Sequence, residues 1–173
     1  MCRGIDYLTR NEIRTMNDGG LIARLEQWMA NTLKALTYGD DEALIFKTAD
    51  IWKHQVGAAN GGGEAFTRFA PFAFVGYDSG GADREGDNDL KQIPKFAIFI
   101  GVESTTDGVA KTGDATHLGI SKIRDLVIEA GDRKHPGSGF TCDEFLYTGE
   151  VKVFDMPRRF AIEMYFECAQ MTQ

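Results

Sequence analysis

The chain has 173 residues, of which 43% are hydrophobic and 26% charged, a composition typical of a soluble globular protein of one domain. Its net charge of −7 argues against nucleic-acid binding, because such binding needs Lys and Arg to neutralise phosphates. The polar N-terminus holds no apolar signal core, and no apolar run is long enough to cross a bilayer. The three scattered cysteines fit a reducing cytosol rather than a disulfide framework.

The first predicted element in chain order is a helix over residues 21–36. Its apolar residues recur with helical spacing, which predicts one buried face. We expect Asn17 or Asp18 to cap its start and Gly39 to lie just past its end. The β-branched and aromatic content of residues 43–54 then predicts a strand.

Loops and strands alternate in the middle of the chain. The Gly triplet within 56–68 predicts a flexible loop. Residues 69–77 predict a strand, and Pro71 places it at a sheet edge or at a bulge, because proline cannot donate to a ladder. Residues 78–92 predict a long polar loop. Residues 94–104 are apolar on both alternate sets, so we expect a central strand covered on both faces.

The last third predicts a helix and two strands. Apolar positions over residues 120–130 share one helical face, and 131–139 has the composition of a turn. Two runs of alternating apolar residues then predict half-buried strands, joined through 153–159 and therefore antiparallel. The residues expected to be buried are Phe145, Tyr147, Val151 and Val153 in one strand and Phe160, Ile162, Met164, Phe166 and Cys168 in the other.

The order of elements predicts an α+β fold. Strands and helices follow one another without a repeated βαβ rhythm, which favours a mostly antiparallel, possibly mixed, sheet with two main helices packed on it and long polar loops. We expect a single domain over 1–173, in which 1–20 forms a flexible N-terminal extension.

A glycine-rich stretch before the second helix has the layout of a phosphate-binding loop. Gly108 and Gly113 have Walker A spacing, but Asp114 stands where a lysine should reach the phosphates, and its carboxylate would repel them. We therefore expect no nucleotide, and interpret Asp114 or Thr116 as a cap of the following helix. Asp114 and His117 could alternatively form an acid–base pair, although no third partner or nucleophile motif accompanies them.

No other candidate for catalysis or metal binding fits its required pattern. The acidic residues between 83 and 89 lack the order of a calcium loop, and the acids beside Cys142 oppose a reactive thiolate. We expect no catalytic residue, metal or cofactor. Three polar segments, 56–68, 78–92 and 103–117, instead favour a protein that works through contacts.

Four blocks of the sequence resemble the tail terminator family of Mu-like phages with contractile tails. The blocks are FAPFAFVGY, PKFAIFIGVES, GDATHLGISKIRDLVIEA and GFTCDEFLYTGEVKVFDMPRRFAIEMYFE. The resemblance runs from about Leu21 to Cys168 and rests on structural blocks rather than on a chemical signature.

The resemblance implies a structural role in the virion tail or neck, assembled in the host cytoplasm. Tail terminators form a homo-hexameric ring that caps the tail tube, stops its polymerisation, joins the tail to the head connector or neck protein and contacts the sheath. DNA passes through the lumen without specific binding, and no membrane is involved. We expect segments 78–91 and 103–117 to line the ring or its contacts. The candidate interface or lumen residues are Asp83, Arg84, Glu85, Asp87, Asp89, Glu103, Lys111 and Asp114.

Three alternatives stay open. Another neck component, such as a stopper or tail-completion protein, would share these patterns. A small hydrolase-like enzyme would use Asp114, His117 and Glu103. A monomeric carrier of a small ligand would line an apolar pocket with its Phe-rich strands.

Overall fold

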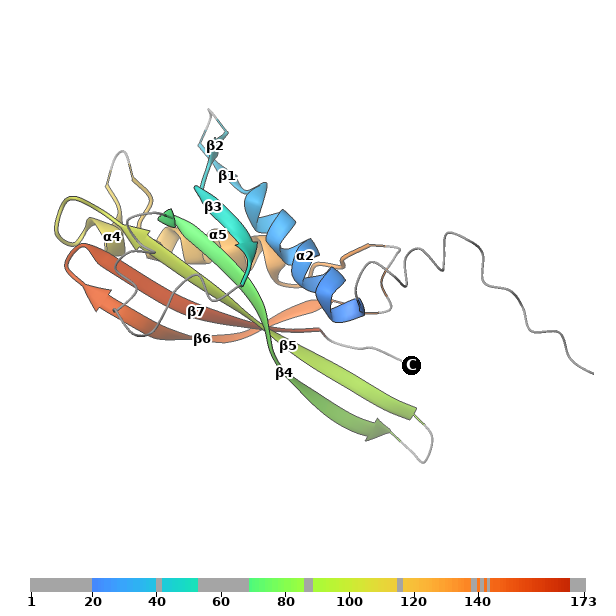
Figure 1. The fold of residues 1–173 in the computed structure, drawn as a ribbon. Coiled ribbons are helices and arrows are strands. Elements are labelled where there is room, and N and C mark those ends of the chain that lie inside the picture. The colour runs from blue at the N-terminus through green and yellow to red at the C-terminus, as the bar shows by residue number, and fades with distance from the viewer. Residues whose placement is uncertain are drawn as a thin grey trace, which may run out of the picture.

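The computed structural model is built on a five-stranded mixed sheet, in which β3 and β4 are parallel and all other neighbours are antiparallel (Figure 1). Its strands, in spatial order, are β3 (Thr48–Ile51), β4 (Phe72–Glu85), β5 (Asp89–Glu103), β7 (Arg159–Cys168) and β6 (Phe145–Met156). A separate antiparallel pair joins β1 (Thr37–Tyr38) to β2 (Ala43–Leu44). The helices are α2 (Leu21–Lys34), α4 (Val109–Thr112) and α5 (Ile120–Gly131). The predicted α+β class is confirmed.

The structure describes residues 20–39, 42–52, 69–85, 89–114, 117–137, 140, 142 and 144–168, and for 81–85 and 89–92 the description is of the backbone. The predicted loop over 56–68 and the predicted caps Asn17 and Asp18 lie outside these residues. None of the helices in this part of the chain is long and apolar enough to span a membrane.

Both predicted main helices pack on the same face of the sheet (Figure 1). Leu25, Met29 and Leu33 recur on one side of α2 and are buried against the strands, as Ile123 and Val127 are on α5. Burial of side chains of this size stabilises the fold by about 1.5–3 kcal/mol each. The helical periodicity thus identified the faces that form the core.

An aromatic pair fastens α2 to the edge of the sheet. The Trp28 ring stacks on the fully buried Phe145 ring, with 5.2 Å between centroids and an interplanar angle of 3°. Phe96 of β5 meets the same Phe145 ring edge-on at 5.7 Å. Contacts of this geometry add to the free energy of burial, so this end of the body is rigidly packed.

The opposite face of the sheet carries a smaller aromatic cluster. Phe72 and Phe74 are buried there, and Phe72 lies 5.6 Å from Phe99 between ring centroids. Gly101 faces the Phe72 ring so closely that a side-chain carbon at this position would overlap it. Strand β5 is therefore covered on both faces over its C-terminal half, as its continuous apolar sequence predicts.

Several predicted boundaries were wrong. The segment 43–54 forms two short strands, β2 and β3, rather than one. Pro71 precedes β4, which has neighbours on both sides, and the bulge in β4 lies between Tyr77 and Ser79. Helix α2 ends at the C-cap Ala35, and Gly39 occupies the turn between β1 and β2 with a φ of 81°. Strands β6 and β7 extend to Met156 and from Arg159, so the connection is shorter than 153–159.

The final strand pair confirms one alternating pattern and corrects the other. In β7 the five apolar residues predicted to be buried are all 6% exposed or less. In β6, Phe145 is buried and Tyr147 partly so, but Val151 and Val153 are each 46% exposed. Bulges between Tyr147 and Gly149 and between Lys152 and Phe154 break the period of two. Val151 consequently lies opposite Glu163, on the other face of the sheet.

Candidate interaction surfaces

Half of the β4–β5 hairpin projects away from the body (Figure 1). Strand β3 pairs with β4 only as far as Val75, and β7 pairs with β5 only from Lys95 onward. Beyond those points, residues 79–85 and 89–94 have no further described strand beside them, and their mutual ladder runs from Gly80 opposite Pro94 to Glu85 opposite Asp89. We call these two segments the β4–β5 arm.

The segment 78–92 was predicted to be a polar loop, and this prediction was wrong. Its Gly and Asp content is unfavourable for strands, but the ladder of β5 holds it in an extended conformation. A two-stranded hairpin is marginally stable by itself in water. A long hairpin that leaves the sheet therefore offers unpaired strand edges to a binding partner.

The base of the β4–β5 arm is fastened from two sides. The Tyr77 N–H donates to Glu26 Oε1 of α2 at 2.6 Å. On the neighbouring strand, the Lys95 ammonium lies 2.6 Å from Glu167 of β7. These polar contacts link the arm to the body at the point where apolar packing ends.

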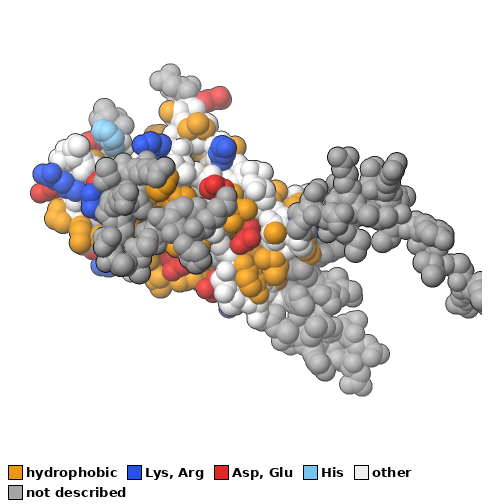
Figure 2. Space-filling view, viewed as in Figure 1, with side chains coloured by type: hydrophobic (Ala, Val, Ile, Leu, Met, Phe, Trp, Pro, Cys, Tyr) orange, Lys and Arg blue, Asp and Glu red, His pale blue; other side chains and the backbone are white. Residues whose placement is uncertain are grey.

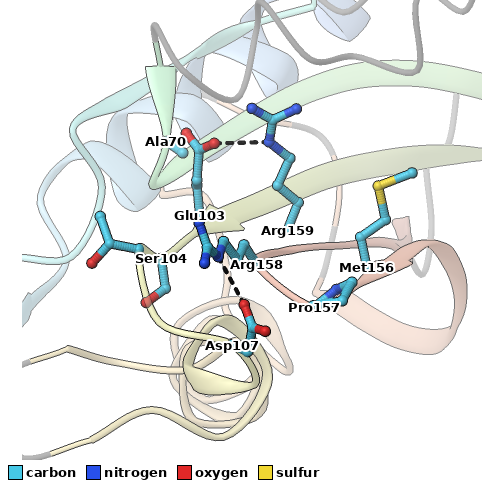
Figure 3. A pocket seen from close by; sticks show the side chains of 9 residues that line it. Ala70, Glu103, Ser104, Asp107, Met156, Pro157, Arg158 and Arg159 are labelled. Atoms are coloured by element: carbon cyan, nitrogen blue, oxygen red, sulfur yellow. Dashed lines mark hydrogen bonds and ion pairs between the residues drawn. The ribbon is translucent and has the colours of Figure 1, made fainter.

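A second surface lies at the other end of the sheet, where β5 ends and β7 begins. An open cleft of about 750 Å³ is lined by Ala70, Glu103, Ser104, Thr105, Asp107, Met156, Pro157, Arg158 and Arg159. Two ion pairs cross its wall: Arg159 Nε lies 2.7 Å from Glu103 Oε1, and Arg158 Nε lies 2.7 Å from Asp107 Oδ1 (Figure 3). Figure 2 shows cationic and anionic side chains mixed at this end of the body. The cleft is thus charged but balanced in sign.

The glycines that resemble a phosphate loop have conformational roles in the structure. Gly108 and Gly113 adopt positive φ angles of 82° and 77° around the four-residue helix α4. Gly113 also lies against Gly119, so that a side-chain carbon on either residue would overlap the backbone of the other. Gly108 is therefore favoured by its positive φ alone, and Gly113 by its positive φ and by a close backbone crossing.

The 103–117 segment was predicted to be a loop, and the structure corrects this prediction. It contains α4, whose Ala110 is 1% exposed. The Lys111 ammonium lies 5.6 Å from the Phe160 ring centroid, a cation–π contact that holds α4 against β7. Helix α4 is therefore packed more closely against the body than the polar sequence around it indicates.

Asp114 does not cap the second helix. Helix α5 starts after Gly119, which gives no side-chain cap, and Thr116 lies outside the described residues. Asp114 Oδ1 instead accepts the His117 N–H at 2.8 Å and lies 3.2 Å from its Nδ1. The acid–imidazole pair exists and is exposed, while Glu103 is ion-paired with Arg159.

The predicted interface residues fall into two groups at opposite ends of β5. Asp83, Arg84, Glu85 and Asp89 occupy the β4–β5 arm, whereas Glu103, Lys111 and Asp114 lie around the other end; Asp87 is outside the described residues. Asp89 and Glu103 are the two ends of the fifteen-residue strand β5, fourteen residue steps or roughly 45 Å apart at 3.3 Å per residue. The two groups therefore do not form one compact surface.

A third surface, on β6, was not predicted from the sequence. Of the seven large hydrophobic side chains that the described residues leave exposed, four lie on this strand: Leu146, Val151, Val153 and Met156. The bulges that expose the valines leave no clear mark in the sequence. Only the glycine at 149, with a φ of 146°, signals irregularity there.

Titratable groups on the helix side of β6 are tied to α5. Glu150 Oε2 accepts from Arg124 Nε at 2.6 Å and from the Tyr147 hydroxyl at 2.8 Å. The hydrogen bond to Glu150 raises the pKa of the Arg124 guanidinium, and burial, followed by the bond to Glu150, raises the pKa of Tyr147. Within the described residues, no three His, Cys, Asp or Glu side chains cluster as metal ligands do.

No protein-family model matches the chain, and no curated protein is significantly similar to it.

Proposed function

We propose that this protein is a structural tail terminator, a ring-forming protein that caps the tail tube of a contractile-tailed phage, stops tube growth and joins the tail to its neck. The observation that carries the proposal is the β4–β5 arm, a long hairpin whose outer half pairs with nothing else in the described chain. The arm adds to the resemblance of the sequence blocks, because a ring is built from heterologous contacts and a projecting hairpin can reach a neighbouring copy.

The two separated groups of charged residues support a protein with two assembly faces. The arm group and the cleft group lie roughly 45 Å apart along β5. One face would contact a neighbouring copy and the other the tube, sheath or neck. The balanced ion pairs of the cleft suit a surface that meets another protein better than one that holds a small anion.

The alternative of an apolar ligand carrier has less support. The hollow beside the aromatic cluster has a volume of about 170 Å³ and is lined in part by Trp52, Phe74 and Phe99. Typical small-molecule sites measure roughly 300–1,000 Å³. In this cluster Phe72 and Phe74 lie 5.0 Å apart between ring centroids, so the aromatic side chains pack against one another.

The proposal is tested by measuring the length of tail tubes assembled from the cognate tube protein. Addition of the chain should shorten the tubes and place a ring at their ends in negative-stain images. The Arg158→Ala variant, altered in the cleft alone, serves to separate a tube-binding defect from a general loss of folding. Tubes of unchanged length, with no added density at either end, would contradict the proposal.

A further inference from the structure

The outer edge of β6 is open over its second half. In antiparallel sheets, residues alternately bond to the neighbouring strand and point away from it. The Phe145 N–H donates to Lys134 O at 3.1 Å and the Tyr147 N–H to Asp132 Oδ1 at 2.9 Å, so both residues point away from β7 and are covered there. No described strand continues this cover along residues 149–156.

The bulge after Tyr147 determines which backbone groups the open edge presents. Tyr147 pairs with Phe166, and Gly149 pairs with the next residue of β7, Tyr165. The one extra residue in β6 reverses which of its residues direct their backbone groups toward β7. Glu150 and Lys152 therefore direct their N–H and C=O groups outward. The Glu150 side chain is held by Arg124 and Tyr147, so the strand edge is fixed in place while its backbone stays available.

Exposed apolar side chains accompany this open edge. Val151, Val153 and Met156 are 46–52% exposed, and they lie in the part of β6 that has no described strand on its outer side. Natural proteins blunt such an edge with charge, proline, bulges or short strands, because it is a template for another strand. Strand β6 carries charged residues and two bulges, yet it is long and leaves these apolar side chains exposed, so its edge stays available to a further strand.

The β4–β5 arm has a matching open edge on β4. The bulge between Tyr77 and Ser79 reverses the alternation there, so Gly80 and Ala82 point away from β5. Gly80 is paired with Pro94, which accordingly points to the outer edge of β5 and has no N–H to offer. Pro94 interrupts the outer edge of β5 where it leaves the body, whereas the outer edge of β4 keeps all its N–H groups, so β4 offers the more regular edge for a further strand.

The two open edges also match in length. The free edge of β4 covers residues 79–85 and that of β6 covers residues 149–156, each roughly 25 Å long at 3.3 Å per residue. They lie on different parts of one chain, so a contact between them repeats from copy to copy in a heterologous manner. A second copy of this chain carries the complementary edge without any other partner.

We propose that the β4 edge of the arm in one copy pairs with the β6 edge of a second copy, so that the sheet continues from copy to copy. The pairing adds a third strand to the isolated arm and covers the apolar side chains of β6. This pairing identifies the surfaces through which copies associate in the proposed function. That the paired copies close into a ring rests on the proposed function.

Two proline substitutions test the pairing without breaking ladder bonds inside the chain. Lys152→Pro and Ala82→Pro each remove an N–H that points outward. The matched controls, Lys152→Ala and Ala82→Ser, keep those N–H groups. We expect both proline variants to remain monomers of 19.1 kDa by light scattering, while the two controls assemble like the wild type. Unchanged far-ultraviolet circular dichroism and thermal midpoints verify that all four variants fold.

A mixture of the two proline variants distinguishes this heterologous pairing from a symmetric one. The Ala82→Pro copy keeps an intact β6 edge and the Lys152→Pro copy keeps an intact arm, so the mixture can make one contact. We expect a dimer of two times 19.1 kDa, about 38 kDa, and no larger species. Wild-type-sized assemblies formed by either proline variant alone would overturn the pairing and leave the proposed ring standing. Assemblies that depend on the pairing but never bind tail tubes would instead contradict the proposed function alone.

Discussion

The two halves of the β4–β5 hairpin share one backbone ladder and differ in their surroundings. In the inner half, Phe72, Phe74, Phe96 and Ile98 are at most 2% exposed, and β3 and β7 pair with its outer edges. In the outer half, Gly, Ser and charged residues pair across the hairpin with no further strand beside them. The inner half thus contributes to the stability of the body. The outer half is held in an extended conformation by the body, and its strand edges are open to a partner.

The largest expected effect is on the inner half. Phe96→Ala removes a fully buried ring that contacts Phe145, and we expect a loss of about 3–5 kcal/mol in the free energy of unfolding. Urea denaturation followed by circular dichroism measures it. A loss below about 1 kcal/mol would show that this half of the hairpin is not the centre of the core.

A pair of glycine substitutions compares the halves directly. A side-chain carbon at Gly101 would overlap the buried Phe72 ring, whereas one at Gly80 would meet the hydroxyl of Tyr77, which is 42% exposed and can move. We expect Gly101→Ala to cost about 1–3 kcal/mol of unfolding free energy through overpacking. Gly80→Ala should cost less than about 0.5 kcal/mol, the range of ordinary surface substitutions. Equal costs for the two variants would remove the distinction between the halves.

Removal of the arm should leave the body folded. Replacement of residues 79–94 by an Asn-Gly turn deletes the part of the hairpin that has no further described strand beside it, so we expect a change in unfolding free energy of less than about 1 kcal/mol. The same variant should lose self-association. Thermal denaturation of the monomer measures the first effect, and a drop in midpoint above about 4 °C would contradict it.

The ion pairs of the cleft should contribute little to stability. Glu103 and Arg159 are about 30% exposed and their pair should be worth about 0.5–1 kcal/mol, whereas the more exposed Arg158–Asp107 pair should be worth less. A double-mutant cycle with alanine at both positions of each pair measures the two coupling energies. A larger coupling for the exposed pair would show that the cleft is organised differently.

The smallest expected effect concerns Asp155, near the end of β6. The hydrogen bond from Lys152 lowers the pKa of this carboxyl below its ordinary value, so the contact is lost only when the pH falls through that lowered pKa. Any contribution to stability is present above the ordinary pKa and lost as the pH falls. Carbon-13 detected titration of the wild type and Lys152→Ala should show the midpoint of Asp155 rising in the variant. An unchanged midpoint would mean that the Lys152 contact does not form in solution.

Sequence periodicity predicted those elements whose own side chains are buried. The apolar faces of α2, α5 and β7 follow from spacing alone, because each element buries one regular stripe. The outer half of the hairpin could not be predicted, since its strand conformation comes from pairing with β5 rather than from its Gly-rich composition. The exposure of Val151 and Val153 also escaped, because two bulges reverse the faces of β6.

For the candidate interface residues, the sequence predicted the segments but not how far apart they lie. Charge and loop composition selected both segments, whereas the distance between them depends on the single strand β5 that joins them. The edge of β6 was missed entirely, since an open strand edge is a property of the sheet order and not of any residue.

The central claim is that the arm joins copies of the chain, and the molar mass of full-length and arm-deleted protein tests it most directly. Light scattering should give a closed assembly for the full chain, near six times 19.1 kDa or about 115 kDa, either alone or with tube protein present. The arm-deleted chain should be a folded monomer under both conditions. Equal masses for the two proteins, whether both assembled or both monomeric, would contradict the account.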